Sequence, residues 1–191
     1  MKKYFLLTVF TLAATLWANA QNLDKMQWFN EPESYTIRNG KLEMDVPAQT
    51  DYWRIAHYGF TVDDGPFLYT TVGGEFEAKI KVSGDYKVRF DQAGMMIRKV
   101  PSDWSVIELK EPIPFLWLKA VRRLDAIELY YSFDDKEYTM MRTLWMQDNC
   151  PLMVGPVAAC PDGQGFKAVF SHFKVKHLPD QRRLEWLKNN Q

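Results

Sequence analysis

The segment from Phe90 to Arg98 places an acid, an amide, a glycine and an arginine inside an otherwise apolar, strand-like run. Burial of such polar groups costs free energy unless each one finds a hydrogen-bond partner. Strand alternation puts Gln92 and Arg98 on one face of this run and Asp91 on the other. We therefore predict either a ligand groove with Gln92 and Arg98 in its wall, or a polar network internal to the protein.

Asp91 suits a structural role better, as a cap for the N–H groups of a nearby loop, because buried polar groups are usually satisfied by internal partners. For Gln92 and Arg98 two roles stay open, contact with a ligand or pairing inside the protein, as of Arg98 with a neighbouring carboxylate. Gly94 lies between them and gives up side-chain packing, which often marks the close approach of a ligand or another backbone.

Tryptophan stands beside aspartate in two further segments, 50–60 and 102–105. Sugar rings suit such pairs, because an indole stacks on the apolar ring face while a carboxylate or guanidinium bonds the hydroxyls. A core role for the tryptophans stays open, and a lone histidine is more often structural than catalytic. The predicted ligand-binding residues are Trp53, Arg54, His57, Gln92, Arg98 and Trp104, and the predicted structural polar residues are Asp51, Asp91 and Asp103.

Catalysis is not supported by any residue pattern. Hydrolysis on a β-sandwich would need two carboxylates that face each other across a groove. The same-face pairs, Glu43 with Asp45 and Glu75 with Glu77, lie on strands whose other face is apolar, so we expect both pairs to face solvent. The sequence contains no nucleophile elbow, phosphate-binding loop or zinc motif. We predict no catalytic residue, no metal site and no cofactor.

These candidate residues must be positioned by β-strands, because short β-rich runs alternate with turn signals along the chain. The clearest is a hairpin of 35–38 and 41–46 around Asn39-Gly40, which supplies the positive φ values of a type I′ turn. Further strands are expected at 75–82, 86–98, 115–122, 126–133, 138–145, 152–159 and 166–175. This spacing predicts an all-β sandwich, and only 181–190 has the pattern of a short helix.

Cys150 and Cys160 are not expected to form a disulfide. Ten extended residues span about 33 Å, whereas bridged Cα atoms lie within about 7 Å. We predict two buried thiols, unless the chain folds back at Gly155-Pro156.

The first twenty residues have the pattern of an export signal. Lys2 and Lys3 precede a short apolar run, and Ala18-Asn19-Ala20 fits a small-x-small cleavage site; an uncleaved anchor is the alternative. Without this segment, 22 basic residues stand against 24 acidic ones, with no basic cluster. Nucleic acid and membrane are therefore not expected as partners. We expect an exported protein, periplasmic or secreted, with a signal peptide at 1–20, a sandwich domain at 21–177 and a helical tail at 178–191.

Three landmarks resemble one family: Asp51-Tyr52-Trp53-Arg54, Asp91-Gln92-Ala93-Gly94 with the residues up to Arg98, and Ser102-Asp103-Trp104-Ser105. It is the domain-of-unknown-function family that includes the regulation of enolase protein 1 group. The resemblance covers most of residues 26–176. It implies a concanavalin A-like jelly-roll sandwich of two curved antiparallel sheets, a lectin/glucanase superfamily whose concave face often binds or cleaves glycans.

The chain departs from this family after Arg98. Family members usually carry a further strand pair with a Trp-Lys-x-Gly motif there, whereas Lys99-Val100-Pro101 leads directly to the next landmark. We therefore expect the sandwich to lack one strand pair and to expose a sheet edge. A shortened groove would also weaken the case for Trp104.

These observations predict an exported, non-catalytic protein that binds carbohydrate, with a glycan as its partner. One alternative is a glycoside hydrolase or lyase on the same fold, which would hold two carboxyl groups about 5–10 Å apart across one groove. The other is a protein-interaction module, in which a partner strand adds to the exposed edge. The identity of the glycan and the oligomeric state do not follow from the sequence.

Overall fold

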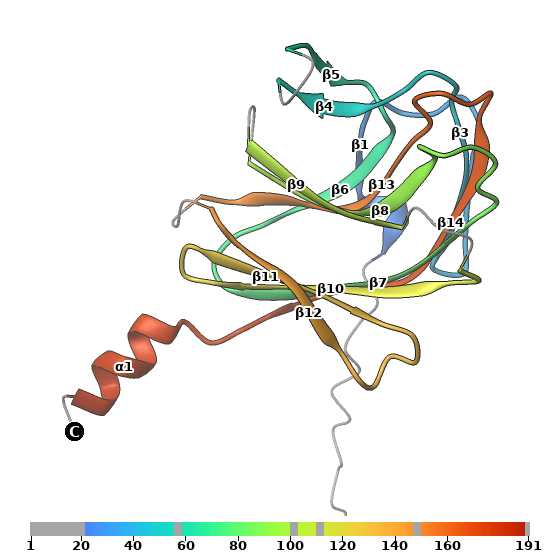
Figure 1. Cartoon of the computed structure of the whole chain (residues 1–191). Helices are drawn as coiled ribbons and strands as arrows, with labels where there is room; N and C mark the ends of the chain where they lie inside the picture. The colour runs from blue at the N-terminus through green and yellow to red at the C-terminus, as the bar shows by residue number, and fades with distance from the viewer. Residues whose placement is uncertain (1–21, 56–58, 100–102, 110–112, 147–149, 190–191) are drawn as a thin grey trace, which may run out of the picture.

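The computed structural model describes residues 22–55, 59–99, 103–109, 113–146 and 150–189, with 103–109 described by their backbone alone. Two antiparallel sheets pack face to face (Figure 1). The five-stranded sheet contains, in spatial order, β1 (Gln27–Phe29), β6 (Phe67–Val72), β13 (Leu152–Ala159), β8 (Gln92–Lys99) and β9 (Asp103–Leu109). The seven-stranded sheet contains β12 (Thr139–Trp145), β11 (Ala126–Ser132), β10 (Leu116–Arg123), β7 (Phe76–Gly84), β14 (Phe166–His177), β3 (Lys41–Val46) and β2 (Tyr35–Arg38).

Three smaller elements complete the fold. A 3₁₀ turn, η1 (Leu23–Lys25), precedes β1, and a two-stranded ribbon is formed by β4 (Tyr52–Arg54) and β5 (Thr61–Asp63). The helix α1 (Gln181–Asn189) follows β14. The predicted all-β sandwich of two antiparallel sheets with a short C-terminal helix is confirmed.

The β2–β3 hairpin forms where the sequence predicts it. Asn39 and Gly40 have φ values of 53° and 70°, the left-handed conformation that a type I′ turn requires. Arg38 then pairs with Lys41 at the end of the ladder. Leu42, Met44 and Val46 are buried on one face of β3, as alternation predicts.

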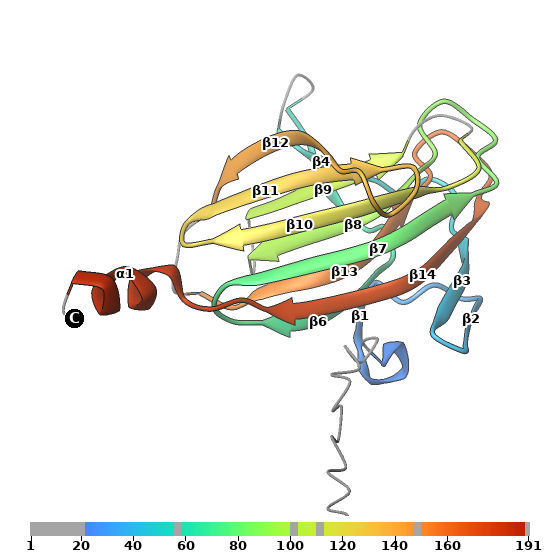
Figure 2. The ribbon, with the colours of Figure 1, turned by 90° about the horizontal axis from the view of Figure 1, so that it is seen from below.

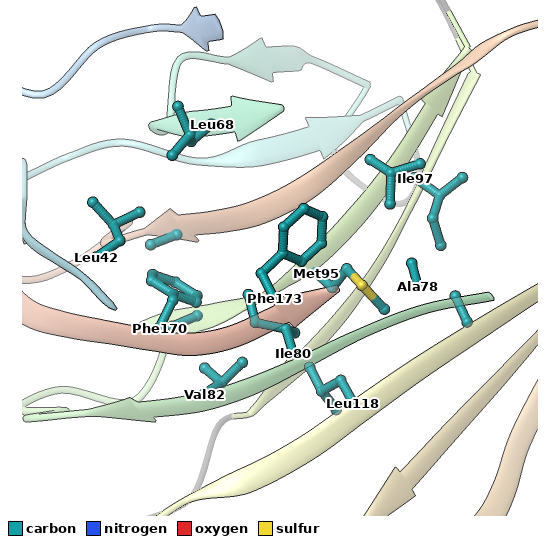
Figure 3. Packing of buried hydrophobic residues seen from close by; sticks show 14 of the residues in the cluster. Leu42, Leu68, Ala78, Ile80, Val82, Met95, Ile97, Leu118, Phe170 and Phe173 are labelled. Carbon is teal, nitrogen blue, oxygen red and sulfur yellow. The ribbon is translucent and has the colours of Figure 1, made fainter. Parts of the chain in front are cut away.

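The main core fills the space between the two sheets. Figure 3 shows Met95 and Ile97 of the five-stranded sheet near Ile80, Leu118 and Phe173 of the seven-stranded one. All five side chains are almost completely buried. Burial of each such side chain stabilises the fold by about 1.5–3 kcal/mol relative to exposure.

One predicted strand is too long. The sequence predicts a strand from Tyr86 to Arg98, but 85–91 form a loop and β8 begins only at Gln92. The Asp91 carboxylate accepts hydrogen bonds from the amides of Lys87 and Val88 at 2.7 and 3.1 Å. These donors are therefore used inside the loop and not in a strand ladder.

Both cysteines are free, as predicted, but only Cys160 is fully buried. Cys150 is half-buried, because it lies just before β13 at one end of the sandwich. The prediction of two buried thiols is therefore wrong for Cys150.

The tail after β14 leaves the body of the sandwich, and α1 projects away from both sheets (Figure 2). None of the nine residues of α1 is buried. Among the residues that the structure describes, no helix has the length and apolar character needed to span a bilayer.

Candidate functional site

The outer face of the five-stranded sheet, which points away from the seven-stranded sheet, carries a second apolar cluster. Alternation along β6, β8 and β13 sends every second side chain to this face. The face is therefore partly covered and not simply solvated. Its buried members are Tyr52, Phe67, Met96, Met153, Val157 and Ala159, with Phe29 and Tyr69 packed against them.

The β4–β5 ribbon covers one part of this outer face (Figure 1). Tyr52 of the ribbon is buried in the second apolar cluster, and its backbone partner on β5 is Asp63. Cross-strand partners share a face, so Asp63 also points toward the sheet. The next pair, Trp53 with Val62, falls on the opposite side of the ribbon.

Tyr52 is held at both ends of its side chain. Its hydroxyl donates a hydrogen bond to the carbonyl oxygen of Gly65, while its ring packs in the second apolar cluster. Burial, followed by the nearby Asp63 carboxylate, raises the pKa of Tyr52 above its usual value. The phenol therefore stays neutral at physiological pH.

Arg98 links β5 to the five-stranded sheet through an ion pair with Asp63. Its Nη1 and Nη2 atoms donate to Oδ1 and Oδ2 of Asp63, both at 2.6 Å. The Arg98 side chain is 4% exposed and that of Asp63 is 31% exposed. The guanidinium carbon also lies 4.3 Å from the ring centroid of Phe29. This bidentate, partly buried geometry is the strong form of an arginine–carboxylate pair.

Gln92 links the other strand, β4, to the sheet at the same end of the ribbon, where Tyr52 pairs with Asp63. Its Nε2 donates to Oδ1 of Asp51 at 3.2 Å, just before β4 begins. The same Asp51 oxygen accepts from the amide of Tyr52 at 2.7 Å, and the amide of Asp51 donates to Oδ1 of Asp64 at 2.8 Å. Gln92 and Arg98 thus have internal partners, so their predicted contact with a ligand stays a prediction.

Asp91 lies on the other side of β8 from these two anchors. It is 1% exposed, and its Oδ1 accepts from the thiol of Cys160 at 3.0 Å while its Oδ2 accepts the two loop amides. Burial, followed by the hydrogen bond to Asp91, raises the pKa of Cys160. The Asp91 side chain therefore stabilises the loop 85–91 and lies away from the outer face of the five-stranded sheet.

The aromatic part of the predicted site lies on the ribbon. The ring centroids of Trp53 and Phe60 are 6.3 Å apart, and Phe60 is 46% exposed. Trp53 is half-buried, and Arg54 is exposed at the end of β4. His57, which was predicted to join them, lies outside the described residues.

The 102–105 landmark is described only by the backbone of β9. In the β8–β9 register, Trp104 pairs with Arg98 and Asp103 pairs with Lys99. Their predicted roles, ligand contact for Trp104 and structural support for Asp103, therefore remain predictions. Among the described residues β9 is the last strand of the five-stranded sheet, and the absence of a strand pair after Arg98 remains a prediction.

Sequence reasoning missed several residues that hold the ribbon in place. The sequence gave no sign that Asp63 pairs with Arg98, that Phe29 lies against the Arg98 guanidinium, or that Tyr52 joins the cluster of Met96. Asn30 was missed as well, although its Nδ2 donates to the carbonyl oxygens of Asp63 at 2.9 Å and Gly65 at 3.1 Å. The sequence offered one hint, an asparagine directly after a strand-like segment, a residue type that tolerates the left-handed φ of 57° found there.

A family comparison decides which group of proteins this chain belongs to. The family described as protein of unknown function DUF1349 matches residues 28–102 and 99–178, which together make up most of the chain. This chain belongs to the DUF1349 family. The two matched segments meet at 99–102, the junction after which the sequence predicts a missing strand pair.

The DUF1349 chain is similar to a yeast protein by sequence and to a yeast structure by fold and sequence. It is 28% identical over 178 residues to "Regulation of enolase protein 1" of Saccharomyces cerevisiae, which covers 80% of this chain and 90% of that protein. A solved structure of a functionally unknown protein from Saccharomyces cerevisiae superposes with a TM-score of 0.73 at 27% identity. That superposition covers 82% of this chain and 98% of the yeast chain.

More distant solved structures share the fold alone. The GH43 BlXynB protein of Bacillus licheniformis has a TM-score of 0.60 at 15% identity, covering 84% of this chain and 38% of its own. A xylan beta-1,4-xylosidase of Bacillus halodurans C-125 has a TM-score of 0.52 at 15% identity, covering 73% of this chain and 33% of its own. The DUF1349 chain thus spans about a third of these longer proteins.

The carboxylates near the ribbon are engaged by internal donors. Asp51 accepts from Gln92, Asp63 from Arg98, and Asp64 from the amide of Asp51. Within the described residues, no three His, Cys, Asp or Glu side chains group as a metal ion would need.

Proposed function

We propose that this DUF1349 protein is an exported, non-catalytic carbohydrate-binding sandwich whose ligand is a neutral glycan. The site is the outer face of the five-stranded sheet together with the β4–β5 ribbon. The observation that carries the proposal is the aromatic pair of Trp53 and Phe60, presented on a ribbon whose two strands are both anchored to this sheet at one end of the ribbon.

Anchoring matters because a binding surface loses less entropy on binding when it is already ordered. Arg98 holds the end of β5 and Gln92 the start of β4, which lie side by side at one end of the ribbon, and Tyr52 packs the inner side of the ribbon on the sheet. The opposite side, which carries Trp53, is then fixed in position. Stacking on a sugar ring needs this kind of rigid aromatic surface.

Hydroxyl-binding groups lie on the same sheet face. Thr71 is exposed, while Tyr69 and Gln92 are half-buried on β6 and β8. Gln92 donates through its Nε2 atom to Asp51, which leaves its amide oxygen as an acceptor oriented by that bond. Such a mixture of flat apolar and directional polar groups suits a neutral sugar.

The context of the fold supports this proposal at a coarser level. Sandwiches of similar fold form about a third of a GH43 protein and of a xylan beta-1,4-xylosidase. At 15% identity these structures are similar to this chain in fold alone. Sugar binding by this chain is therefore part of the proposal.

Export is also part of the proposal. It depends on the basic, apolar and small-residue pattern of 1–20, which predicts a mature protein that begins at Gln21. N-terminal sequencing of the protein recovered from the periplasm or medium of an expressing cell tests it, since retention of Met1 would contradict cleavage.

The hydrolase or lyase alternative finds less support. The three carboxylates near the ribbon are bound to internal donors, and Asp63 is locked in a bidentate pair. Release of reducing sugar or unsaturated product from a panel of polysaccharides would revive this alternative.

Calorimetric titration with soluble xylan, arabinoxylan, β-glucan and galactomannan tests the proposed function. We expect Trp53→Ala to weaken binding about tenfold, which corresponds to about 1.4 kcal/mol of stacking. Trp145→Ala is the matched control, because Trp145 is 74% exposed and lies on β12 of the other sheet. Equal binding by the two variants, or no binding of any polysaccharide, would overturn the proposal.

A further inference from the structure

The outer face of the seven-stranded sheet, which points away from the core, carries a row of lysines. Figure 2 views the molecule from this side, with β14, β7, β10 and β11 next to one another. Lys174 of β14 pairs with Lys79 of β7, and Lys79 pairs with Lys119 of β10. Lys81 lies two residues after Lys79 on the same face of β7. Three strands therefore bring four lysines together, in a cluster that the sequence does not show.

This row of lysines is unfavourable for the fold by itself. Adjacent strands lie only about 4.8 Å apart, and like charges directly opposite each other in a sheet are destabilising. In the row, Lys79 has a lysine opposite it on both sides. An arrangement that costs stability at the centre of a sheet is typical of a functional surface.

One carboxylate compensates part of this charge. Asp135, in the turn between β11 and β12, accepts from Nζ of Lys79 at 2.6 and 2.9 Å. Within the part of the chain that the structure describes, Lys81, Lys119 and Lys174 form no ion pair with a carboxylate. Four lysines against one carboxylate leave a net charge of +3 at the centre of this face.

The acids around the row have other partners. Glu77 lies opposite Lys176 in the next row of the face, and Glu128 accepts from the hydroxyl of Tyr130 at 2.6 Å. Asp134 accepts from two backbone amides of the β11–β12 turn at 2.8 and 3.1 Å. The lysines at the centre of the face therefore keep an excess of positive charge, which favours an anionic ligand.

Aromatic rings hold two of the ammonium groups in place. Nζ of Lys119 lies 4.0 Å from the ring centroid of Tyr138 and 4.8 Å from that of Tyr130. Nζ of Lys81 lies 3.7 Å from the ring centroid of Phe115. Such contacts position an ammonium group but do not neutralise it. Because the charges are already ordered, a ligand that binds them loses less entropy in ordering the surface.

We propose that this face binds an acidic polysaccharide, a chain of sugars that carry carboxylates. The four lysines are spread across three strands and not gathered around one point, so an extended chain with repeated charges suits them better than a small molecule. Lysine is a compact point charge that pairs with a carboxylate in many orientations, whereas phosphate and nucleic-acid surfaces favour the bidentate fork of arginine. This face belongs to the opposite sheet from the β4–β5 ribbon, so the proposal is independent of the neutral-glycan site.

Calorimetric titration of the full-length mature chain with polygalacturonate and alginate tests the proposal. Each polymer is compared with its esterified form, in which the carboxylates carry no charge, and with duplex DNA. We expect at least one of the acidic polymers to bind, and its esterified form to bind about tenfold more weakly or less. Equal binding of the charged and esterified forms, DNA binding as tight as that of the acidic polymers, or no binding of either acidic polymer would overturn the proposal.

Two pairs of lysines on the same sheet provide the matched variants. Lys81→Gln combined with Lys119→Gln should weaken binding of the acidic polymer about tenfold or more, because it removes two charges that no carboxylate pairs with. Lys41→Gln combined with Lys167→Gln removes two lysines that pair with Glu43 and Asp45, and should change binding by less than about threefold. Equal losses of binding in the two double variants would contradict the proposal.

Thermal unfolding separates a binding role from a structural one. If Lys81 and Lys119 served only to stabilise the sheet through their ring contacts, their replacement by glutamine would lower the Tm. We expect instead a Tm that is unchanged within about 2 °C or raised, because repulsion between neighbouring lysines is relieved. A fall of more than about 5 °C would contradict the proposal. Trp53→Ala should leave binding of the acidic polymer unchanged, which distinguishes this site from the neutral-glycan site.

Discussion

Gln92 and Arg98 share one face of β8, and each ends on a carboxylate of the segment that carries the ribbon. Asp91 turns the other way and ends on loop amides and a thiol. The three polar residues of this short segment therefore have two separate structural roles. Two of them fix the outer ribbon, and one fixes the loop that leads into the strand.

At the residue scale, Asp91→Asn should destabilise the protein by about 2–3 kcal/mol, because a buried charged acceptor is lost. The amide could keep the two loop N–H groups but would place its NH₂ group against the Cys160 thiol. Urea unfolding followed by tryptophan fluorescence measures the change.

Asp45→Asn is the control for this substitution. Asp45 is an exposed partner of Lys167, with its side chain 53% exposed, so the same change should cost less than about 1 kcal/mol. Equal costs at positions 91 and 45 would show that the loop does not depend on the buried carboxylate.

The raised pKa of Tyr52 leads us to expect a loss of stability at alkaline pH. Burial raises its pKa in the folded protein, so the unfolded chain loses the phenol proton first as pH rises. The contribution of Tyr52 to the free energy of unfolding is fully present below pH 10. Above pH 10 the free energy of unfolding falls by up to about 1.4 kcal/mol per pH unit.

Urea unfolding between pH 8 and 11 measures this loss. Tyr52→Phe removes the titrating group, so its stability should fall less steeply above pH 10 than that of the wild type. Cys160 also has a raised pKa and contributes in both proteins, so the difference between the curves isolates Tyr52. Parallel curves would contradict the expectation.

At the scale of elements, the β4–β5 ribbon depends on side chains of β8 for its position. A two-stranded ribbon is at best marginally stable by itself in water. Its attachment comes from the Arg98–Asp63 pair, the Gln92–Asp51 bond and the packing of Tyr52. The ribbon is therefore expected to detach before the sandwich unfolds.

Arg98→Met should release the ribbon, because it leaves the Asp63 carboxylate beside an apolar cluster without its bidentate partner. Amide exchange of the peptides that contain Tyr52–Arg54 and Thr61–Asp63 should become at least about tenfold faster, and the proposed glycan binding should weaken with it.

Arg123→Met is the control for the ribbon. Arg123 forms a similar ion pair with Glu75 at the opposite end of the fold, at 2.6 Å. Exchange in the ribbon should not change in this variant. Faster exchange in both variants would point to a general loss of stability and not to a local anchor.

At the scale of the whole molecule, the sandwich and the tail differ in how they are held. The sheets share a continuous core, whereas α1 is exposed along its length, including Leu184 at 45% and Trp186 at 63%. The tail contacts the body at Glu75, which accepts from the amide of Gln181, and at Arg123, which pairs with Glu75 and also donates to the carbonyl oxygen of Pro179 at 3.1 Å.

Removal of 181–191 should therefore leave the sandwich intact. We expect a fall in Tm of about 3 °C or less, since the loss of buried area is small and about 1 kcal/mol corresponds to a few degrees in a chain of this size. Thermal unfolding by circular dichroism measures it. A fall of more than about 10 °C would show that α1 is part of the cooperative unit.

The local elements of this protein were determined by its sequence. Asn39-Gly40 predicted the β2–β3 hairpin, and the uninterrupted apolar run 152–159 predicted the bounds of β13. The hairpin follows from φ preferences and the strand from a continuous apolar run, and both signals act over a few residues. Membership of the family was also predictable, because its landmarks lie in short contiguous segments.

Only the tertiary structure decided what the polar residues do. Arg98 meets Asp63 across 35 residues, and Cys160 meets Asp91 across 69. The end of the predicted strand at Asp91 and the partners of Gln92 both depend on which strands become neighbours. Local preferences carry no information on that choice, because it is made by the burial of the whole core and by the order of strands in each sheet.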